Sequence, residues 1–388
     1  MPLTDRILTT HVGSLPRPTT LLDQMKRKLA GNPVPGYPEM VAAAVAETVD
    51  RQIASGIDIV SDGEMSKPGF FTYVQERLAG FAPTGAKFSS FKAEMDAFPE
   101  YYADYFARAM NGGAVAPIQP MTCVGPVSYR GREALAADIA NLKAATAGKP
   151  VAGVFMPSVS PNGVGTNSYY KTQEEFLFAV ADALRVEYLA IIDAGFTLQV
   201  DEPFISHVFV DEPDPVVQNK TVELQMEAIN HAIRGIPHDR IRLHNCYGIN
   251  EGPRIHEATL AQVLPFLLKA KVGTLSFEGA NCRHEHEYHL FERINLPDGM
   301  KIAPGVITHA SNIVEHPELI AERLMRYIKL VGRENVIASS DCGFSSQACY
   351  KTEVDPRVMW AKFQALAEGA RLASEASRVL AGTGAMSR

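Results

Sequence analysis

Two side chains that commonly bind metals lie two positions apart in the segment Ile241–Cys246, namely His244 and Cys246. The short apolar run before them predicts a β-strand, in which residues i and i+2 point to the same face. An imidazole and a sulfur would therefore be directed at one point, and both are donors that zinc accepts. Such a pair also arises by chance, since a buried free cysteine is usually a small hydrophobic residue. The assignment therefore depends on the rest of the chain.

Two other predicted strand ends supply further donors. Glu278 follows the apolar run 273–277, and Cys342 follows the run 335–340. The intervals of 32 residues (246 to 278) and 64 residues (278 to 342) correspond to one and two repeats of an alternating β/α fold. Together with His244 and Cys246 they would complete a four-ligand zinc site. Such an electron-rich zinc suits the activation of a substrate thiol as its thiolate, and the predicted chemistry is alkyl transfer to sulfur.

Helix and strand periods alternate along most of the chain. Helices are expected over 41–54, 173–194 and 317–330, and each is followed by a glycine and then an apolar strand. This alternation predicts a parallel sheet in an α/β fold. The strand candidates are 7–12, 57–62, 118–124, 151–156, 196–201, 240–245, 273–277, 301–306 and 335–340.

The positions of the polar residues favour a (β/α)8 TIM barrel over an open, doubly wound sheet. They follow the expected strand ends, which in a barrel meet at one mouth. No Gly-x-Gly-x-x-Gly follows the first strand, so the fingerprint of a nucleotide-binding doubly wound sheet is missing. Nine strand candidates are one more than the eight strands of such a barrel, so we expect an inserted segment around residues 80–125. The barrel is predicted as one domain over 1–380, with a frayed tail over 381–388. The residues at strand ends are His11, Glu64, Asp201, His244, Cys246, Glu278, His309 and Cys342.

The composition excludes several classes of partner. The chain has 388 residues and a net charge of −7, and it contains no block of Lys and Arg, so neither nucleic acid nor an anionic membrane is expected as a partner. No apolar run reaches membrane-spanning length, and the first residues do not resemble a signal peptide. Five cysteines, an odd number, fit a reducing cytoplasm rather than a disulfide framework. Whether the chain forms a homo-oligomer stays open.

The motifs together carry a family resemblance. The chain resembles the catalytic barrel of cobalamin-independent methionine synthase, within the superfamily that also includes uroporphyrinogen decarboxylase. The segments that carry it are His11-Val12-Gly13-Ser14, Asp62-Gly63-Glu64, Gln199-Val200-Asp201-Glu202-Pro203, His244-Asn245-Cys246, Phe277-Glu278, Pro304-Gly305-Val306-Ile307-Thr308-His309 and Ser340-Asp341-Cys342-Gly343.

The resemblance implies a zinc site and an amino-acid thiol as substrate. Glu64 and Asp201 would hold the ammonium of homocysteine, and Ser14 would contact its carboxylate. His309 would be the acid that protonates the leaving group. The implied zinc ligands are His244, Cys246, Glu278 and Cys342.

The methyl donor is left undetermined. The family's folate region carries a Gly-Pro-Val-Thr run and a tryptophan, whereas the matching strand end here is the segment 156–164 and the one tryptophan is Trp360. The chain is more similar to single-barrel members of the methionine synthase II type. That group includes epoxyalkane:coenzyme M transferase, so thiol addition to an epoxide is an alternative. The acidic pair Glu64 and Asp201 favours an amino-acid thiol over a sulfonate.

Three other interpretations remain. A metal-free lyase similar to uroporphyrinogen decarboxylase would need arginines for its substrate carboxylates. A zinc-stabilised binding protein would unfold when it lost its metal. The segment 283–289, with His284, His286 and His289, could form a second metal site, although a polar loop is the simpler interpretation, and nearby Cys282 has no assigned role.

Overall fold

The main sheet is a ring of parallel strands. The computed structural model describes residues 6–84, 91–107, 113–116, 118–248 and 251–385, with side chains up to residue 379. Seven strands pair in the order β1-β4-β6-β7-β8-β9-β10, and every pairing is parallel. Their bounds are β1 Ile59–Val60, β4 Gly153–Val159, β6 Thr197–Asp201, β7 Ile241–Asn245, β8 Thr274–Phe277, β9 Lys301–Ile307 and β10 Ser339–Ser340.

The segment around Thr9 closes the ring. Thr9 forms a parallel bridge with Ala338, just before β10, and its carbonyl accepts hydrogen bonds from the amides of Asp58 and Ile59 at β1. The Asp58 carboxylate also accepts from the Thr9 amide at 3.0 Å. Seven strands and this segment occupy the eight positions of a (β/α)8 barrel. The predicted fold class is confirmed.

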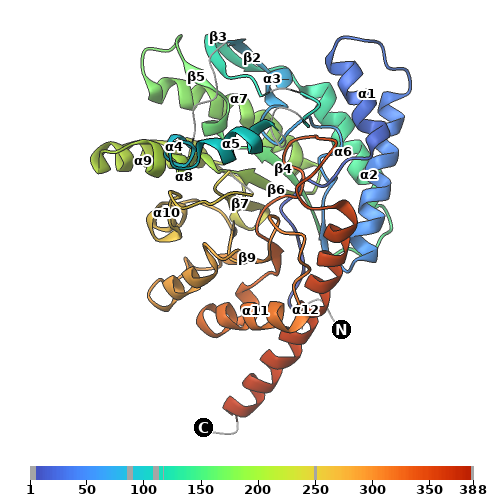
Figure 1. The fold of residues 1–388 in the computed structure, drawn as a ribbon, viewed down its shortest axis with the longest axis vertical. Helices are drawn as coiled ribbons and strands as arrows, with labels where there is room; N and C mark the ends of the chain where they lie inside the picture. Colours follow the sequence, from blue (N-terminus) through green and yellow to red (C-terminus); the bar gives the residue numbers. More distant parts are fainter. Residues whose placement is uncertain (1–5, 85–90, 108–112, 117, 249–250, 386–388) are drawn as a thin grey trace.

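The helices surround the ring and begin and end where their sequences indicate. In α7 (Gln173–Asp193), the Thr172 side chain accepts a hydrogen bond from the Glu175 amide at 3.0 Å, and Gly195 follows with a φ of 94°. The last helix, α12, continues to Ala385, beyond the predicted domain end at residue 380, and it extends from the body in Figure 1. Residues 386–388 of the predicted tail lie outside the described residues. The other helices of eight or more residues are α1 Thr19–Leu29, α2 Tyr37–Ala54, α6 Arg132–Thr146, α8 Phe204–Asp211, α9 Pro215–Ala232, α10 Leu260–Leu267 and α11 Pro317–Val331.

The ninth strand candidate lies in a separate small sheet. This sheet has the order β2-β3-β5, with β2 (Leu78–Pro83) antiparallel to β3 (Met121–Tyr129) and β3 parallel to β5 (Thr166–Asn167). Exposed residues recur along β3, including Val124 at 56% exposure, whereas every residue of β7 is buried. Strands of a closed barrel are covered on both faces, so this pattern marks β3 as an insertion.

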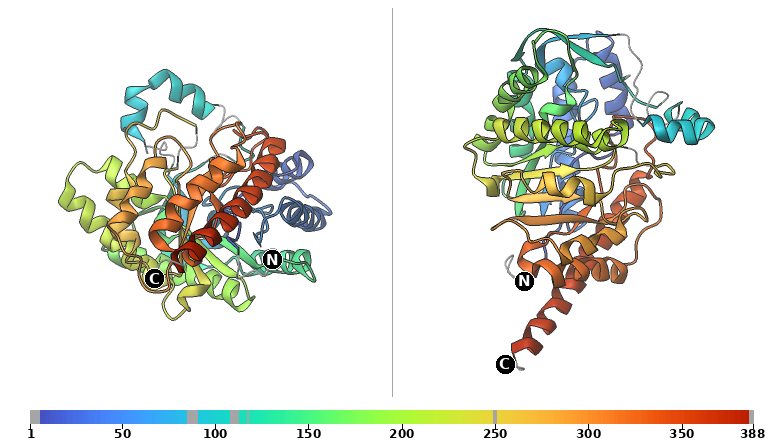
Figure 2. Two further views of the ribbon diagram at one scale, coloured as in Figure 1. Left: turned by 90° about the horizontal axis from the view of Figure 1, so that it is seen from below. Right: turned by 90° about the vertical axis from the view of Figure 1, so that its left-hand side faces the viewer.

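The inserted region also carries short helices, α3 (Val74–Arg77), α4 (Lys92–Ala97) and α5 (Pro99–Tyr105). Figure 2 shows α4 and α5 projecting from one side of the molecule. Residues 85–90, 108–112 and 117 of the predicted insertion lie outside the described residues.

A buried carboxylate ties the inserted region to the barrel. Glu187 of α7 accepts hydrogen bonds from Tyr73 at 2.6 Å, Tyr129 at 2.5 Å and Ser158 at 2.8 Å, and it pairs with Arg77 at 3.2 Å. Burial alone would raise the pKa of Glu187, but Arg77 and the hydroxyl donors lower it below its usual value. The charged form is therefore the one that these contacts stabilise.

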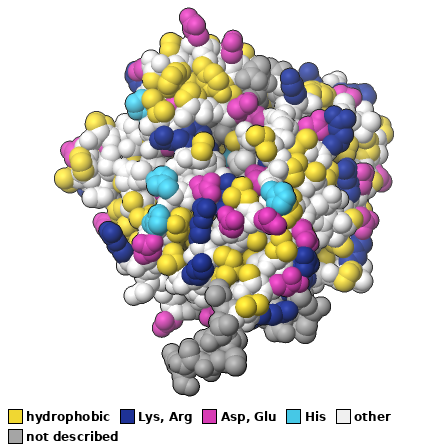
Figure 3. Space-filling model, turned by 60° about the horizontal axis from the view of Figure 1, so that its bottom comes forward, with side chains coloured by type: hydrophobic (Ala, Val, Ile, Leu, Met, Phe, Trp, Pro, Cys, Tyr) yellow, Lys and Arg dark blue, Asp and Glu magenta, His cyan; other side chains and the backbone are white. Residues whose placement is uncertain are grey.

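One face of the outer surface is mixed in charge. On the face drawn in Figure 3, acidic and basic side chains are interspersed. No helix among the described residues is long and apolar enough to cross a membrane.

Candidate active site

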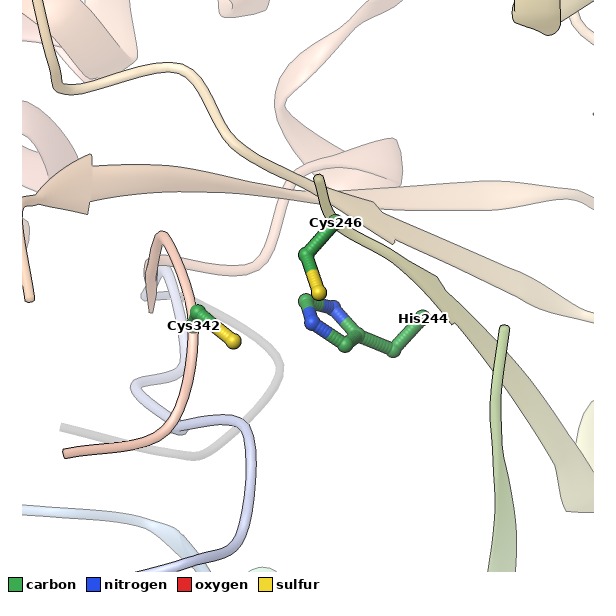
Figure 4. A group of neighbouring side chains, drawn as sticks. All are labelled: His244, Cys246 and Cys342. Carbon is green, nitrogen blue, oxygen red and sulfur yellow. The ribbon is translucent and has the colours of Figure 1, made fainter. Parts of the chain in front are cut away.

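Three of the four predicted zinc ligands converge. His244 lies near the end of β7, Cys246 follows that strand, and Cys342 follows β10. Their ligand atoms all lie within 4.8 Å of one another, and all three residues are buried. Figure 4 shows the three side chains pointing toward a common space. The period of two along β7 therefore places His244 and Cys246 as expected, and the ring brings Cys342 to them.

The orientation of His244 leaves one ring nitrogen available. Its Nδ1 lies 3.1 Å from the hydroxyl of Ser276, which is its register partner on β8. Its buried Nε2 has no hydrogen-bond partner. Burial lowers the pKa of His244 to about 3, so the ring is neutral at pH 7. A neutral imidazole fixed through one nitrogen is the form that ligates a metal through the other.

The two thiols are adjacent in a small apolar environment formed with Val12. The hydrogen bond with Cys246, together with burial, raises the pKa of the Cys342 thiol well above its usual value. A divalent cation would oppose this shift, because a coordinated thiol is deprotonated. Two sulfurs and one unpaired imidazole nitrogen form a donor set that fits zinc.

The fourth predicted ligand, Glu278, lies outside this group. It follows β8 and is 2% exposed. One oxygen, Oε2, accepts hydrogen bonds from Arg254 Nη2 at 2.7 Å and Asn281 Nδ2 at 2.8 Å. The other, Oε1, faces the Tyr247 amide at 3.4 Å. The structure therefore brings together a ligand group of three residues, with the Glu278 carboxylate engaged elsewhere.

The predicted ammonium site contains two buried acids. Glu64 adopts a positive φ of 58°, its Oε1 lies 3.4 Å from Lys67 Nζ, and its buried Oε2 has no hydrogen-bond partner. Asp201, at the end of β6, accepts a hydrogen bond from Gln199 Nε2 at 2.7 Å. Burial and the negative charge of Glu64 raise the pKa of Asp201 well above its usual value. Lys67 and the more distant Arg17, 4.0 Å from Oε2, offset part of the negative charge of Glu64, and a substrate ammonium could stabilise the ionised form of Asp201 further.

Ser14 packs against the loop that carries Cys342. Its carbonyl accepts a hydrogen bond from the Phe344 amide at 2.9 Å. A Cβ added at Gly343 would lie 2.0 Å from the Ser14 hydroxyl, so glycine is required for this approach. Ser14 is thereby held beside the ligand group.

Six of the predicted site residues line one cavity of about 170 Å³. Glu278 and His309 are not among its lining residues. The wall carries several aromatic side chains, and Lys351 is the one cationic side chain among the described lining residues. The predicted site residues on the wall are Ser14, Glu64, Asp201, His244, Cys246 and Cys342, and the aromatic ones include Phe70, Phe71, Phe91, Tyr105, Phe204, His207 and Phe344.

His309 is buried just past β9, at 2% exposure. Burial is the largest cause that lowers its pKa to about 4. The imidazole is therefore neutral at pH 7 in this environment.

Sequence reasoning missed two residues at this site. His207 lies on α8, lines the cavity and has a buried Nε2 with no hydrogen-bond partner. Its place six residues after Asp201, on the same strand-to-helix connection, was a usable signal. Arg254 lies in the loop after β7 and reaches Glu278 only through the tertiary fold, so no spacing in the sequence indicates it.

The residues of the predicted second metal site either pair with carboxylates or are exposed. His284 lies between Glu257 and Glu287, at 3.1 Å and 2.7 Å, while His286, His289 and Cys282 are exposed. Within the described part of the chain, the one group of three or more metal donors is His244, Cys246 and Cys342. The segment 283–289 is better explained as part of an ion-pair network and a surface turn.

Comparison with known proteins identifies the family of the chain. Residues 7–362 match the sequence model of the family described as "Cobalamin-independent synthase, Catalytic domain". A methionine synthase from Sulfolobus acidocaldarius is 26% identical over 342 residues, covering 86% of this chain and 85% of the relative. One from Thermococcus kodakarensis is 24% identical over 369 residues, covering 94% and 92%.

The fold also has a solved counterpart. The structure of a B12-independent methionine synthase from Shewanella sp. W3-18-1, in complex with selenomethionine, superposes with a TM-score of 0.72 at 22% identity, covering 97% of this chain and 99% of that one. The family match extends over nearly the whole barrel and includes the converging His244, Cys246 and Cys342. The chain therefore belongs to the family of cobalamin-independent methionine synthase catalytic domains.

Proposed function

We propose that this protein is a zinc-dependent methyltransferase that methylates homocysteine on sulfur to give methionine, with a donor still to be identified. One observation carries the proposal: the His244, Cys246 and Cys342 donors line the same cavity as the acidic pair Glu64 and Asp201. A substrate with a thiol at one end and an ammonium at the other could engage both. The methionine synthase relatives support the same reaction.

The amino-acid end of homocysteine has matching groups on the wall. The Oε2 of Glu64, which has no hydrogen-bond partner within the chain, can accept a hydrogen bond from an ammonium, and Asp201 adds a second carboxylate. The Ser14 hydroxyl can donate to the substrate carboxylate. A substrate ammonium would also stabilise the ionised form of Asp201, whose pKa is otherwise raised by burial and by Glu64.

At the thiol end, the chain orients the ligands. Zinc bound by His244, Cys246 and Cys342 would lower the pKa of a substrate thiol and keep it as the reactive thiolate. Ser276 fixes the ring of His244, and the walls of the cavity restrict the approach of a methyl donor to the sulfur. The role of His309 as an acid stays a prediction; a neutral ring could serve as a hydrogen-bond donor to the leaving group.

The cavity wall favours this reaction over its rivals. A decarboxylase-like lyase would need arginines for its substrate carboxylates, and a sulfonate thiol would need a cationic partner. Lys351 is the one cationic side chain among the described lining residues, against Glu64, Asp201 and Glu353. An epoxide reaction with a sulfonate thiol and a metal-free lyase therefore receive less support.

The first test is metal content and thiol methylation. Purified protein should contain about one zinc per chain. Cys342→Ser should lose most of the zinc and reduce methylation at least a hundredfold, because it removes one of three converging ligands. Cys282→Ser, which changes an exposed cysteine, should behave as the unmodified protein.

The assay should offer homocysteine with a folate, methylcobalamin, an S-methyl compound and an epoxide in parallel. Transfer of a methyl group to homocysteine from one of these donors is the expected result. Full zinc in Cys342→Ser would overturn the ligand assignment. Reaction of a sulfonate thiol with the epoxide, without homocysteine methylation, would favour the alternative reaction.

A further inference from the structure

Part of the cavity is bordered by aromatic rings that the contacts proposed for homocysteine leave unused. The ring centroids of Phe70 and Phe71 lie 4.9 Å apart, and the centroid of Phe204 lies 6.4 Å from the first and 6.2 Å from the second. All three residues line the cavity, and all three are only partly buried. Partly exposed rings that gather on a concave surface are typical of a ligand site. These rings are therefore available to a second substrate.

The fold brings these rings together from separate parts of the chain. Phe204 begins α8, and a Cβ added at Gly163 would lie 2.1 Å from its ring, so a glycine is needed for this close approach. The ring of His207, also on α8, has its centroid 6.1 Å from that of Phe204 and 4.7 Å from that of Phe91 in the inserted region. We call this continuous set of rings the aromatic wall; its members are Phe70, Phe71, Phe91, Phe204 and His207.

His207 adds an electron-rich nitrogen to the aromatic wall. Burial lowers its pKa to about 4, so the ring is neutral at pH 7. A hydrogen bond with the backbone of Tyr247 opposes this shift, as a bond that the ring donates to a carbonyl does. Its Nε2 has no hydrogen-bond partner within the chain. The proton therefore lies on Nδ1, and Nε2 carries a lone pair, which attracts positive charge, as the faces of aromatic rings do.

The charged side chains around the cavity also favour a cation. Glu353 lines the cavity and accepts a hydrogen bond from the Tyr105 hydroxyl at 2.7 Å. Lys351, the one cationic side chain among the described lining residues, is exposed, so water and salt screen it. Because Glu64 and Asp201 are assigned to the ammonium of homocysteine, Glu353 is left for the other substrate. A cleft lined mainly by acids concentrates ligands of positive charge.

We propose that the aromatic wall binds the methyl donor and that this donor carries its methyl group on a positively charged sulfur or nitrogen atom, as an onium group. The inference rests on the proposed function and names the chemical class of its second substrate. In the transfer, the bond between the methyl carbon and the onium atom breaks, and its electron pair stays with the leaving sulfur or nitrogen. The methyl carbon bonds to the thiolate sulfur of homocysteine. A neutral thioether or amine leaves, and no proton is transferred.

Choline and its carbon analogue, in which carbon replaces the charged nitrogen, test the preference for positive charge without any reaction. The two compounds have nearly the same shape, so their affinities differ through charge. Calorimetry on protein loaded with zinc and homocysteine should show choline binding about tenfold more tightly, within the range that cation–π contacts supply. Equal affinities, or no binding of choline, would overturn the proposal.

The ratio of these two affinities reports on single side chains. Phe70→Leu keeps the wall apolar but removes one aromatic face, and it should lower the ratio about threefold to tenfold. Glu353→Gln removes a negative charge but keeps an acceptor for Tyr105, and it should lower the ratio as well. Phe178→Leu is the matched control, because this partly buried ring packs against His231, 4.6 Å away, outside the lining residues. It should leave the ratio unchanged.

The ratio compares two ligands on the same protein, so a general loss of structure does not imitate the expected effect. Glu353→Gln remains informative even if Phe70→Leu does not fold. A ratio that is unchanged in both variants would show that the cation binds elsewhere and would overturn the assignment to the aromatic wall.

Methyl transfer distinguishes the two kinds of onium donor. Trimethylsulfonium and choline are offered separately to protein loaded with zinc and homocysteine, and methionine is measured. Transfer from trimethylsulfonium alone would assign the site to sulfonium donors, and transfer from choline alone would assign it to quaternary ammonium donors. Methionine formed from a folate or methylcobalamin, but from neither onium compound, would overturn this inference and leave the proposed function intact. Protein that binds neither zinc nor homocysteine would overturn both.

Discussion

At the scale of single residues, His244 shows how a ligand depends on a neighbour that sequence spacing does not reveal. The His-x-Cys spacing places the ring and Cys246 on one face of β7, which follows from strand geometry. The available Nε2, however, results from the contact of Nδ1 with Ser276. That contact exists because β7 and β8 pair with His244 opposite Ser276. The place of His244 beside Cys246 was predictable, whereas its ring orientation required the register.

His284 provides a prediction about pH. Its hydrogen bonds with Glu257 and Glu287 outweigh burial and raise its pKa to about 9 from a usual 6.5. A raised pKa stabilises the folded state fully below about pH 6.5, and this contribution is lost as the pH rises to about 9. In urea unfolding at pH 6, 7, 8 and 9, the difference in stability between the unmodified protein and His284→Gln should shrink as the pH rises.

An exposed histidine supplies the control for that series. His289 pairs with Glu292 at 2.6 Å, but both side chains are about half exposed, at 59% and 46%. The His289→Gln variant should therefore change stability little at any of the four pH values. A difference for His284→Gln that stays constant from pH 6 to pH 9 would contradict the assignment of a protonated His284.

At the scale of secondary-structure elements, the inserted region depends on one buried carboxylate. Glu187 receives three hydroxyl donors and Arg77, which joins β3 and the segment just before β2 to α7. Replacing Glu187 with Gln removes the charge while keeping the size, and should destabilise this attachment by about 2–4 kcal/mol. Hydrogen exchange should then speed up in β2 and β3 and remain unchanged in β7 and β8.

The matched control lies on the same helix. Glu174 is exposed in the first turn of α7, so Glu174→Gln should leave exchange in the inserted sheet unaffected. Faster exchange throughout the barrel in Glu187→Gln would mean that the carboxylate supports the whole fold rather than the inserted region.

The elements themselves were largely predictable because their signals are local. The helix expected over 173–194 is observed as Gln173–Asp193, and that expected over 317–330 as Pro317–Val331. Capping side chains, glycines and apolar periods lie within the segments they define. The segment 118–124 was also recognised as a strand, but which sheet it joins depends on β2 and β5, from other parts of the chain.

At the scale of the whole molecule, we expect the barrel to hold its strands together without a metal. The ring is closed by backbone hydrogen bonds between the Thr9 segment, β1 and the residue before β10, and one large apolar core packs the strands and the surrounding helices together. Removal of zinc with a chelator should therefore abolish homocysteine binding while lowering the melting temperature by only a few degrees, the effect of losing a bound ligand.

Circular dichroism during chelation and after zinc is restored would test this expectation. Recovery of thiol binding on adding zinc, without a change in the spectrum, is the expected outcome. Unfolding on chelation would instead support the interpretation of the chain as a zinc-stabilised binding protein.

The sequence by itself determined the alternation of strands and helices, the place of the polar residues at strand ends, and the donor chemistry of His244, Cys246 and Cys342. These properties depend on residue type and on spacing along one segment. Only the tertiary structure decided that Thr9 closes the ring and that Arg254 donates a hydrogen bond to Glu278. The physical reason is that a carboxylate takes the partners that surround it in space, and those of Glu278 come from loops on both sides of β8. The sequence showed that Glu278 could bind zinc, and the fold placed a guanidinium 2.7 Å from it.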